Sequence, residues 1–311
     1  IRDRYLSLEE DKFQKIVCAY LAEYAVKYFG EEQLESNSFT YRLKTILDNV
    51  MYLMKHIMEE LSQSEFFVAD CELKIGEDIP SYTIVLPDGH KIAVCGSVDR
   101  VDIMQRADIT YLRIIDYKTG TKQFKLSDIL YGINLQMLLY LHSIEASGGD
   151  KYGEIVPAGI LYMPATVPYI SSDSLKSIDK LPDELNKKLK MNGLLLKDTE
   201  IIHGMDKTDV ATYIPVKIKA GEPVSSTSLA TLAEFGKIFK KVDMLIAEMG
   251  KNIYNGNIEA KPLKGGHDSC EYCPYDSVCA YRQSNPITCF SVDNKTVIEE
   301  ITNEINGKEE E

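Results

Sequence analysis

The order of extended and helical segments constrains the fold of this chain more than any other feature of its sequence. Four segments are rich in β-branched, aromatic or small apolar residues and are predicted to be strands: 82–86, 91–98, 111–117 and 158–163. A pattern of helical spacing separates the last two strands, over roughly 126–146. This β-β-β-α-β order predicts an α/β fold in which helices flank a mixed central β-sheet.

The segments on either side of this core are assigned from the same patterns. Residues 8–64 have apolar side chains at helical spacing with a break at Gly30, 65–76 are expected to be extended, and 226–253 are expected to form a long amphipathic helix. Residues 164–220 are expected to form a less regular peripheral excursion, and the acidic C-terminal residues a frayed helix. We therefore expect three parts: an N-terminal helical segment packed on the core (1–64), a core domain that ends in a cysteine cluster (65–290) and an acidic tail (291–311).

Composition excludes some classes of protein. The 311 residues can form one large domain or two small ones. The sequence contains no run of about 18 apolar residues, so we expect no membrane span. The chain begins with Ile1 rather than Met, which suggests a fragment, and no secretory signal opens it. A net charge of −13 argues against tight nonspecific binding of nucleic acid by this chain alone, because phosphate contacts need local positive charge. Seven cysteines, an odd number, favour a reduced, cytoplasmic setting.

Two acidic residues and a lysine lie where two predicted strands meet. Asp99 follows Gly96 at the end of one strand, and Asp116 and Lys118 lie two positions apart on the next, so their side chains share a face. Two carboxylates suit Mg²⁺ or Mn²⁺, and the backbone carbonyl of Tyr117 would add a third oxygen. Lys118 would orient or deprotonate a water molecule and offset charge on a phosphate. The alternative is a solvated strand end with a salt bridge.

The following helix carries two more polar candidates. Gln136 and Tyr140 are four positions apart and share a helix face, while neighbouring leucines are expected to face the sheet. The two side chains would then stand over the strand that carries Asp116 and Lys118, within reach of a phosphate or a metal-bound water. The alternative is a core glutamine and a packed tyrosine. Asp102 either supports a neighbouring arginine or faces solvent.

Three groups of residues together resemble the nuclease motifs of a known superfamily: Gly96…Asp99-Arg100-Val101-Asp102, Asp116-Tyr117-Lys118-Thr119-Gly120 and Tyr131-Gly132…Leu135-Gln136…Tyr140-Leu141. They are similar, over roughly 65–290, to the RecB-type branch of the PD-(D/E)XK nucleases, and above all to the nuclease region of AddB-type subunits of bacterial AddAB helicase–nucleases. The resemblance implies that Asp99 and Asp116 bind the metal, that Lys118 is the catalytic lysine, and that Gln136 and Tyr140 support them.

The resemblance also implies an activity and partners. It implies a Mg²⁺- or Mn²⁺-dependent deoxyribonuclease, acting as an exonuclease on single strands that a helicase–nuclease partner subunit delivers during double-strand-break repair and recombination. The family has a further metal ligand, a helix-borne His or Glu upstream. His56 and Glu72 are candidates, and a residue before Ile1 is the third possibility.

Three cysteines crowd together near the C-terminus, at Cys270, Cys273 and Cys279. Their spacing is typical of metal ligands, although zinc and iron–sulfur sites usually take four. The resemblance implies a structural [4Fe–4S] cluster whose fourth ligand lies N-terminal to the core, which leaves Cys18 or a residue absent from this sequence. Cys289 is close in sequence, but its spacing does not match the family. The alternative is three free thiols in a surface loop.

Three functions remain open at this level. The first is the nuclease, and the intact Asp99, Asp116 and Lys118 favour it. The second is a catalytically silent DNA-binding or scaffold subunit that retains the fold, and the third is a zinc-binding module. The sequence contains no Gly-x-x-x-x-Gly-Lys-Ser/Thr motif, so we expect no ATP-driven motor within it.

Overall fold

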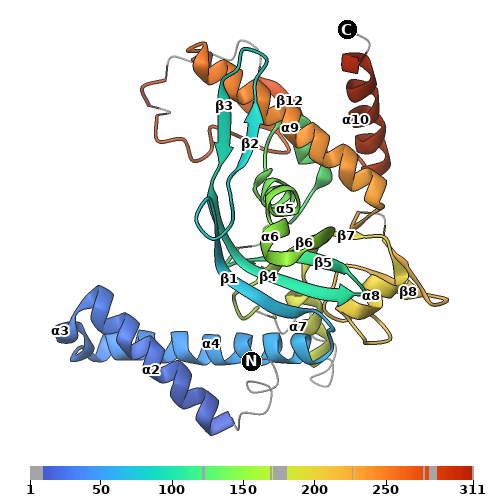
Figure 1. Ribbon diagram of the computed structural model, residues 1–311. Helices are drawn as coiled ribbons and strands as arrows, with labels where there is room; N and C mark the ends of the chain where they lie inside the picture. Colours follow the sequence, from blue (N-terminus) through green and yellow to red (C-terminus); the bar gives the residue numbers. More distant parts are fainter. Residues whose placement is uncertain are drawn as a thin grey trace.

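The computed structural model describes residues 10–120, 123–168, 170, 181–225, 227–275, 277–279 and 286–309. Six strands of this part of the chain form a central sheet in the order β1-β4-β5-β6-β7-β10 (Figure 1). Their bounds are β1 (Phe67–Ile75), β4 (Gly96–Arg106), β5 (Ile109–Lys118), β6 (Glu154–Pro164), β7 (Asn192–Leu196) and β10 (Leu229–Ala230). The pairs β5–β6 and β7–β10 are parallel and the other neighbours are antiparallel, so the predicted mixed sheet is confirmed.

Helices cover both faces of this sheet (Figure 1). On one side lie α4 (Asn37–Ser62) and α8 (Thr199–Met205), and on the other lie α5 (Gln136–Ser147), α6 (Gly149–Tyr152) and α9 (Leu232–Tyr254). The two central strands are therefore buried on both faces, as their nearly continuous apolar sequences predict. Leu112, Ile114 and Ile115 of β5 are fully buried, as are Ala158 and Leu161 of β6.

The remaining elements are short or peripheral. The helices are α2 (Glu10–Phe29), α3 (Glu31–Leu34), η1 (Leu126–Tyr131), α7 (Leu181–Leu189) and α10 (Asn294–Glu309). Three two-stranded sheets complete the described chain: β2 (Tyr82–Val85) with β3 (Lys91–Val94), β8 (Lys217–Lys219) with β9 (Glu222–Val224), and β11 (Leu263–Gly265) with β12 (Ile287–Cys289).

Some predicted boundaries of helices and strands agree with the structure, and others differ. Gly30 separates α2 from α3 with a φ of +80°, as the predicted break requires. The predicted strand 91–98 is two strands, β3 and β4, which separate at Cys95. The predicted helix 126–146 is also interrupted, because Gly132 and Asn134 adopt left-handed conformations between η1 and α5. The long helix begins at Leu232 with a capping box, because the residues before it form β10.

Two expectations for the C-terminal half are wrong. The predicted peripheral excursion 164–220 contains β7, a strand of the central sheet, whose Leu194 and Leu195 are fully buried. The predicted C-terminal helix is confirmed as α10, but it is not frayed, because it packs against α9 and η1. Its Val297 and Ile301 are fully buried, so hydrophobic burial fixes this helix in place despite its acidic sequence.

Candidate active site

The site is built where β4 and β5 separate. Arg100 pairs with Ile115 in the antiparallel register, so Asp99 stands one position further on, across from Asp116. Directly opposed residues of such a pair have Cβ atoms about 4.5–5.5 Å apart. At this point the backbone hydrogen bonds between β4 and β5 give way to a hydrogen bond with the Asp99 side chain. The backbone N–H of Tyr117 donates to Oδ2 of Asp99 over 3.0 Å. The Asp99 carboxylate therefore reaches across to β5.

Asp116 and Lys118 form a close ion pair on β5. Nζ of Lys118 lies 2.5 Å from Oδ2 of Asp116, and the two side chains are only 26% and 10% exposed. This contact lacks hydrogen-bond geometry, and no other described residue donates to this buried oxygen. A buried carboxylate oxygen without a hydrogen-bond donor is available as a ligand for a cation.

A tyrosine that the sequence did not single out completes the floor of the site. Tyr162 of β6 lies across from Asp116 in the parallel register, and the Lys118 ammonium stands 5.5 Å from the centre of its ring. Burial raises the pKa of Tyr162 to about 12, and the charges of Asp116 and Asp128 act in the same direction. Tyr162 is therefore a neutral phenol at physiological pH. Its position within a predicted buried strand gave no signal of this role.

Glu72 lies near the acidic pair but is held elsewhere. Cys71 pairs with Arg100 and Leu73 with Val98, so Glu72 is level with Asp99 on the neighbouring strand. Its backbone is left-handed, with a φ of +54°, and its carboxylate accepts a hydrogen bond of 3.0 Å from Ser97 Oγ. Within the described ranges, no three His, Cys, Asp or Glu side chains converge into a metal-binding group.

Gln136 and Tyr140 both lie on α5, and Tyr140 contacts the start of β4. The Tyr140 ring packs directly on Gly96, where a Cβ atom would lie 2.3 Å from Tyr140 Oη. A side chain at this position would displace the tyrosine, which explains the glycine. Gln136 is exposed in the first turn of α5, where the positive end of the helix dipole favours an anion. Tyr140 therefore contacts the start of β4, while α5 as a whole packs on β5 and β6.

A buried charge network supports the same two strands from the side of α4. Asp102 is fully buried and accepts hydrogen bonds of 2.7 and 2.6 Å from Arg100 and of 3.1 and 2.9 Å from Arg113. Glu60 of α4 accepts from both arginines, over 3.1 and 2.6 Å. Burial alone would raise the pKa of Asp102, but Arg100 and Arg113 overcome it and lower the pKa. Asp102 therefore supports Arg100 and does not face solvent, while the sequence gave no sign of Glu60 or Arg113.

His56 lies on the α4 side of the sheet. Its ring centre is 5.4 Å from that of Tyr213, and burial lowers its pKa although Glu59 and Glu60 act in the opposite direction. Because α4 covers the face of the sheet opposite α5, His56 is not part of the group formed by Asp99 and Asp116.

A second titratable cluster joins the hairpin β2–β3 to α5 and α9. His142 Nε2 lies 3.2 Å from both Tyr82 Oη and Asp243 Oδ2, and its Nδ1 lies 3.4 Å from Glu145. The ring also stacks on Phe239. Burial by itself lowers the pKa of His142, but Asp243 and Glu145 raise it to about 9. A protonated His142 therefore holds these three elements together.

The cysteine cluster occupies a segment of turns after β11. Cys270 and Cys273 are half-buried and Cys279 is exposed, and the Cys273 backbone N–H donates to the Cys270 carbonyl over 3.2 Å. None of the seven cysteines forms a disulfide. The three sulfur atoms do not gather into a metal-binding group with other described residues. The [4Fe–4S] assignment of these three cysteines stays a prediction.

The predicted fourth cluster ligand is Cys18 or a residue absent from this sequence, and Cys289 was set aside because of its spacing. Cys18 lies on α2, at the opposite end of the molecule from the segment that follows α9 (Figure 1). Cys289 ends β12, pairs with Gly265, and accepts a hydrogen bond of 3.1 Å from Gly266 at its carbonyl. In space, Cys289 is therefore the nearer of the two to the cluster segment.

In this structure the strands of a mixed sheet separate at two opposed aspartates with a lysine beside them. The model of the PD-(D/E)XK nuclease superfamily matches residues 5–280. The chain belongs to this superfamily, which confirms the resemblance drawn from its motifs. Nucleases of the superfamily generally use divalent metals such as Mg²⁺.

Relatives with a more specific name are similar to most of the chain. Each is named as a subunit of an ATP-dependent helicase/deoxyribonuclease. Those of Thermoanaerobacter sp. (strain X514), Alkaliphilus oremlandii (strain OhILAs) and Alkaliphilus metalliredigens (strain QYMF) are 38%, 36% and 33% identical over 246, 275 and 292 residues. The matches cover 77%, 85% and 90% of this chain but 21%, 24% and 25% of the relatives. The chain thus spans about a quarter of the length of the curated relatives it matches.

Proposed function

We propose that this chain is the nuclease module of a helicase–nuclease and hydrolyses DNA phosphodiester bonds with Mg²⁺ or Mn²⁺. The observation that carries this proposal is the buried, incompletely hydrogen-bonded Asp116 carboxylate, with Lys118 beside it and Asp99 opposite. Mg²⁺ typically keeps several waters and takes one or two carboxylates together with substrate phosphates. Two aspartates and the Tyr117 carbonyl fit this pattern without a complete protein cage.

Each residue has a defined task in this proposal. Asp99 and Asp116 hold the cation, which when bound supplies charge to stabilise the pentavalent phosphorus centre. Lys118 donates hydrogen bonds to a phosphate oxygen or orients the attacking water, because its ammonium already stands at the Asp116 carboxylate. Glu72 is a weaker candidate that would act through a water molecule after release from Ser97. Gln136 and Tyr140 hold the phosphate from the N-terminal part of α5.

The substrate and partners follow from charge and from the relatives. The relatives carry the name of a helicase/deoxyribonuclease subunit, and a chain with a net charge of −13 depends on a partner for its DNA path. We propose that a helicase partner subunit delivers single strands, which the module degrades as an exonuclease in double-strand-break repair and recombination in the cytoplasm. No helix among the described residues has the length and hydropathy to cross a bilayer.

The cysteine segment is proposed to hold a structural [4Fe–4S] cluster through Cys270, Cys273 and Cys279. Three cysteines at compact spacing support this assignment. The fourth ligand is either a cysteine of this chain or a residue absent from this sequence. Anaerobically purified protein would be brown if the proposal holds, whereas colourless protein with bound zinc would indicate a zinc site instead.

Cleavage of end-labelled single-stranded DNA tests the proposed activity. We expect cleavage with Mg²⁺ or Mn²⁺, none in EDTA, and a loss of about 100-fold or more in Asp116→Asn and Lys118→Ala. Asp108→Asn, in the exposed turn between β4 and β5, is the matched control and should retain full activity. DNA binding without metal-dependent cleavage would instead indicate a catalytically silent scaffold.

A further inference from the structure

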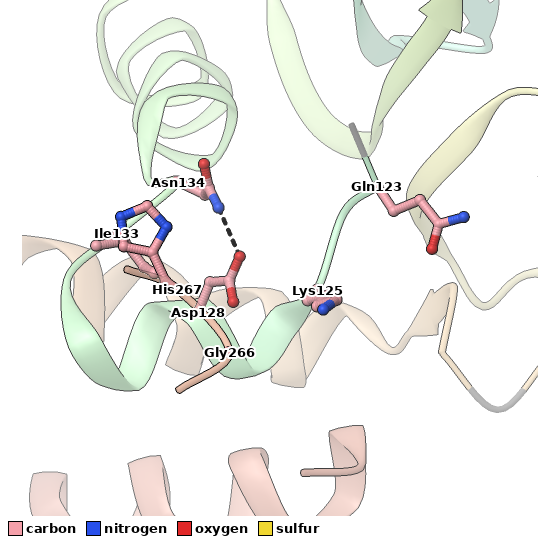
Figure 2. Close-up of a pocket in the computed structure, with 7 residues that line it drawn as sticks. All are labelled: Gln123, Lys125, Asp128, Ile133, Asn134, Gly266 and His267. Atoms are coloured by element: carbon pink, nitrogen blue, oxygen red, sulfur yellow. Dashed lines mark hydrogen bonds between the residues drawn. The ribbon is translucent and has the colours of Figure 1, made fainter. Parts of the chain in front are cut away.

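A polar pocket lies at the start of α5. It has a volume of about 250 Å³ and is lined by residues of the loop after β5, of η1 and of the segment after β11. Figure 2 shows its side chains, which include Gln123, Lys125, Asp128, Asn134 and His267. None of these residues has a task in the proposed hydrolysis.

Hydrogen bonds and strand register connect the pocket to the site. The backbone N–H of Phe124, between two pocket residues, donates to Asn192 Oδ1 over 2.7 Å. Asn192 pairs with Tyr162 on the neighbouring strand, and Tyr162 pairs in turn with Asp116. The rim of the pocket is therefore fixed to the same end of the sheet as the acidic pair, two strands away from it. A strand of DNA held at Asp116 would pass close to this pocket.

The pocket presents hydrogen-bond acceptors. Asp128 Oδ2 accepts a hydrogen bond of 2.6 Å from Asn134 Nδ2, as Figure 2 shows. Oδ1 of Asp128 and Oδ1 of Asn134 have no donor among the residues that the structure describes. The left-handed backbone of Asn134, with a φ of +55°, and the hydrogen bond of 3.2 Å from Ile133 N–H to the Asp128 carbonyl hold this arrangement in advance of binding.

We propose that this pocket binds a base of the DNA strand next to the scissile phosphate and prefers bases with an exocyclic amino group. This inference rests on the proposed nuclease function and names how that site selects its substrate. A carboxylate repels a phosphate but accepts a hydrogen bond from an amino group such as N4 of cytosine, whereas thymine has no such group.

Other lining residues fit the rest of a nucleotide. Lys125 is exposed, where its ammonium is able to hold a backbone phosphate outside the pocket. His267 is exposed and offers a flat ring on which a base can stack. Gln123 adds an amide with both donor and acceptor groups. Positive charge outside and acceptors inside favour a base that enters while its phosphate stays at the surface.

Binding of short fluorescent oligo-dC and oligo-dT at neutral pH tests the inference. The protein is Asp116→Asn without divalent cations, so the result does not depend on cleavage. We expect oligo-dC to bind about fivefold to tenfold more tightly than oligo-dT. In the same background, Asp128→Ala should remove this preference and leave the affinity for oligo-dT unchanged. Lys125→Ala should weaken the binding of both oligonucleotides equally. The salt dependence of binding should then correspond to about one fewer released counterion.

Several outcomes would overturn the inference. One is equal affinity for the two oligonucleotides, and another is a preference that survives Asp128→Ala. Asp108→Ala is the matched control, because it removes an exposed carboxylate outside the pocket. Cleavage by the unsubstituted protein without any base preference would contradict the pocket proposal alone. A base preference in a protein that never cleaves DNA would contradict the proposed function alone.

Discussion

Loss of the Asp102 carboxylate should destabilise the protein more than loss of any exposed carboxylate. In Asp102→Ala, two fully buried guanidiniums lose the four hydrogen bonds that Asp102 accepts, and Glu60 alone remains to compensate two positive charges. Removal of one partner of a buried ion pair costs about 3–5 kcal/mol. Because a domain is typically stable by about 5–15 kcal/mol, this is a large part of the total.

Urea unfolding followed by far-UV circular dichroism measures this loss. The matched control, Asp108→Ala in the turn between β4 and β5, should lie within about 0.5 kcal/mol of the unsubstituted protein. Glu60→Ala should also be strongly destabilising, and the double variant should cost more than the sum, since each carboxylate partly compensates the two shared arginines when the other is removed. A loss below about 1 kcal/mol in Asp102→Ala would refute this reasoning.

Two further predictions concern packing and pH. Gly96→Ala should cost about 1–3 kcal/mol of stability because its Cβ would overlap the Tyr140 side chain. Adding Tyr140→Ala should relieve much of that cost. Strictly additive losses of the two substitutions in urea unfolding would contradict this contact. The folded pKa of His142, about 9, exceeds its unfolded value of about 6.5, so its interaction with Asp243 should stabilise the protein fully below pH 6.5 and be lost as the pH rises through 9. His142→Gln should flatten the pH dependence of the urea midpoint in this window, whereas exposed His203→Gln should not; an unchanged profile in His142→Gln would contradict the prediction.

Local patterns were enough to place the site residues that share a strand. Alternation along a strand predicts that Asp116 and Lys118 share a face, and their ion pair bears this out. The prediction that Asp99 faces Asp116 depended only on two adjacent strands and a short turn, and the register places them opposite each other. Their role in catalysis stays a prediction.

Residues brought together by distant packing could not be predicted in this way. Glu60 lies 40 positions before Arg100, and only the docking of α4 on the sheet reveals their pairing. The strand β7 was missed because its three consecutive leucines are too short a run to have a distinctive period. Gly193 allows that strand to approach β6 closely, since a Cβ there would lie 2.0 Å from the carbonyl oxygen of Ile160. This fit depends on the partner strand and leaves no trace in the local sequence.

Anomalous scattering from a crystal soaked in Mn²⁺ tests the proposed metal site most directly. We expect one strong peak between the carboxylates of Asp99 and Asp116, beside the Tyr117 carbonyl, and its loss in crystals of Asp116→Asn. The assignment of this pair as the catalytic metal ligands would be contradicted by two results together. These are a crystal in which the carboxylates bind no Mn²⁺ and Mn²⁺-dependent cleavage that persists in Asp116→Asn.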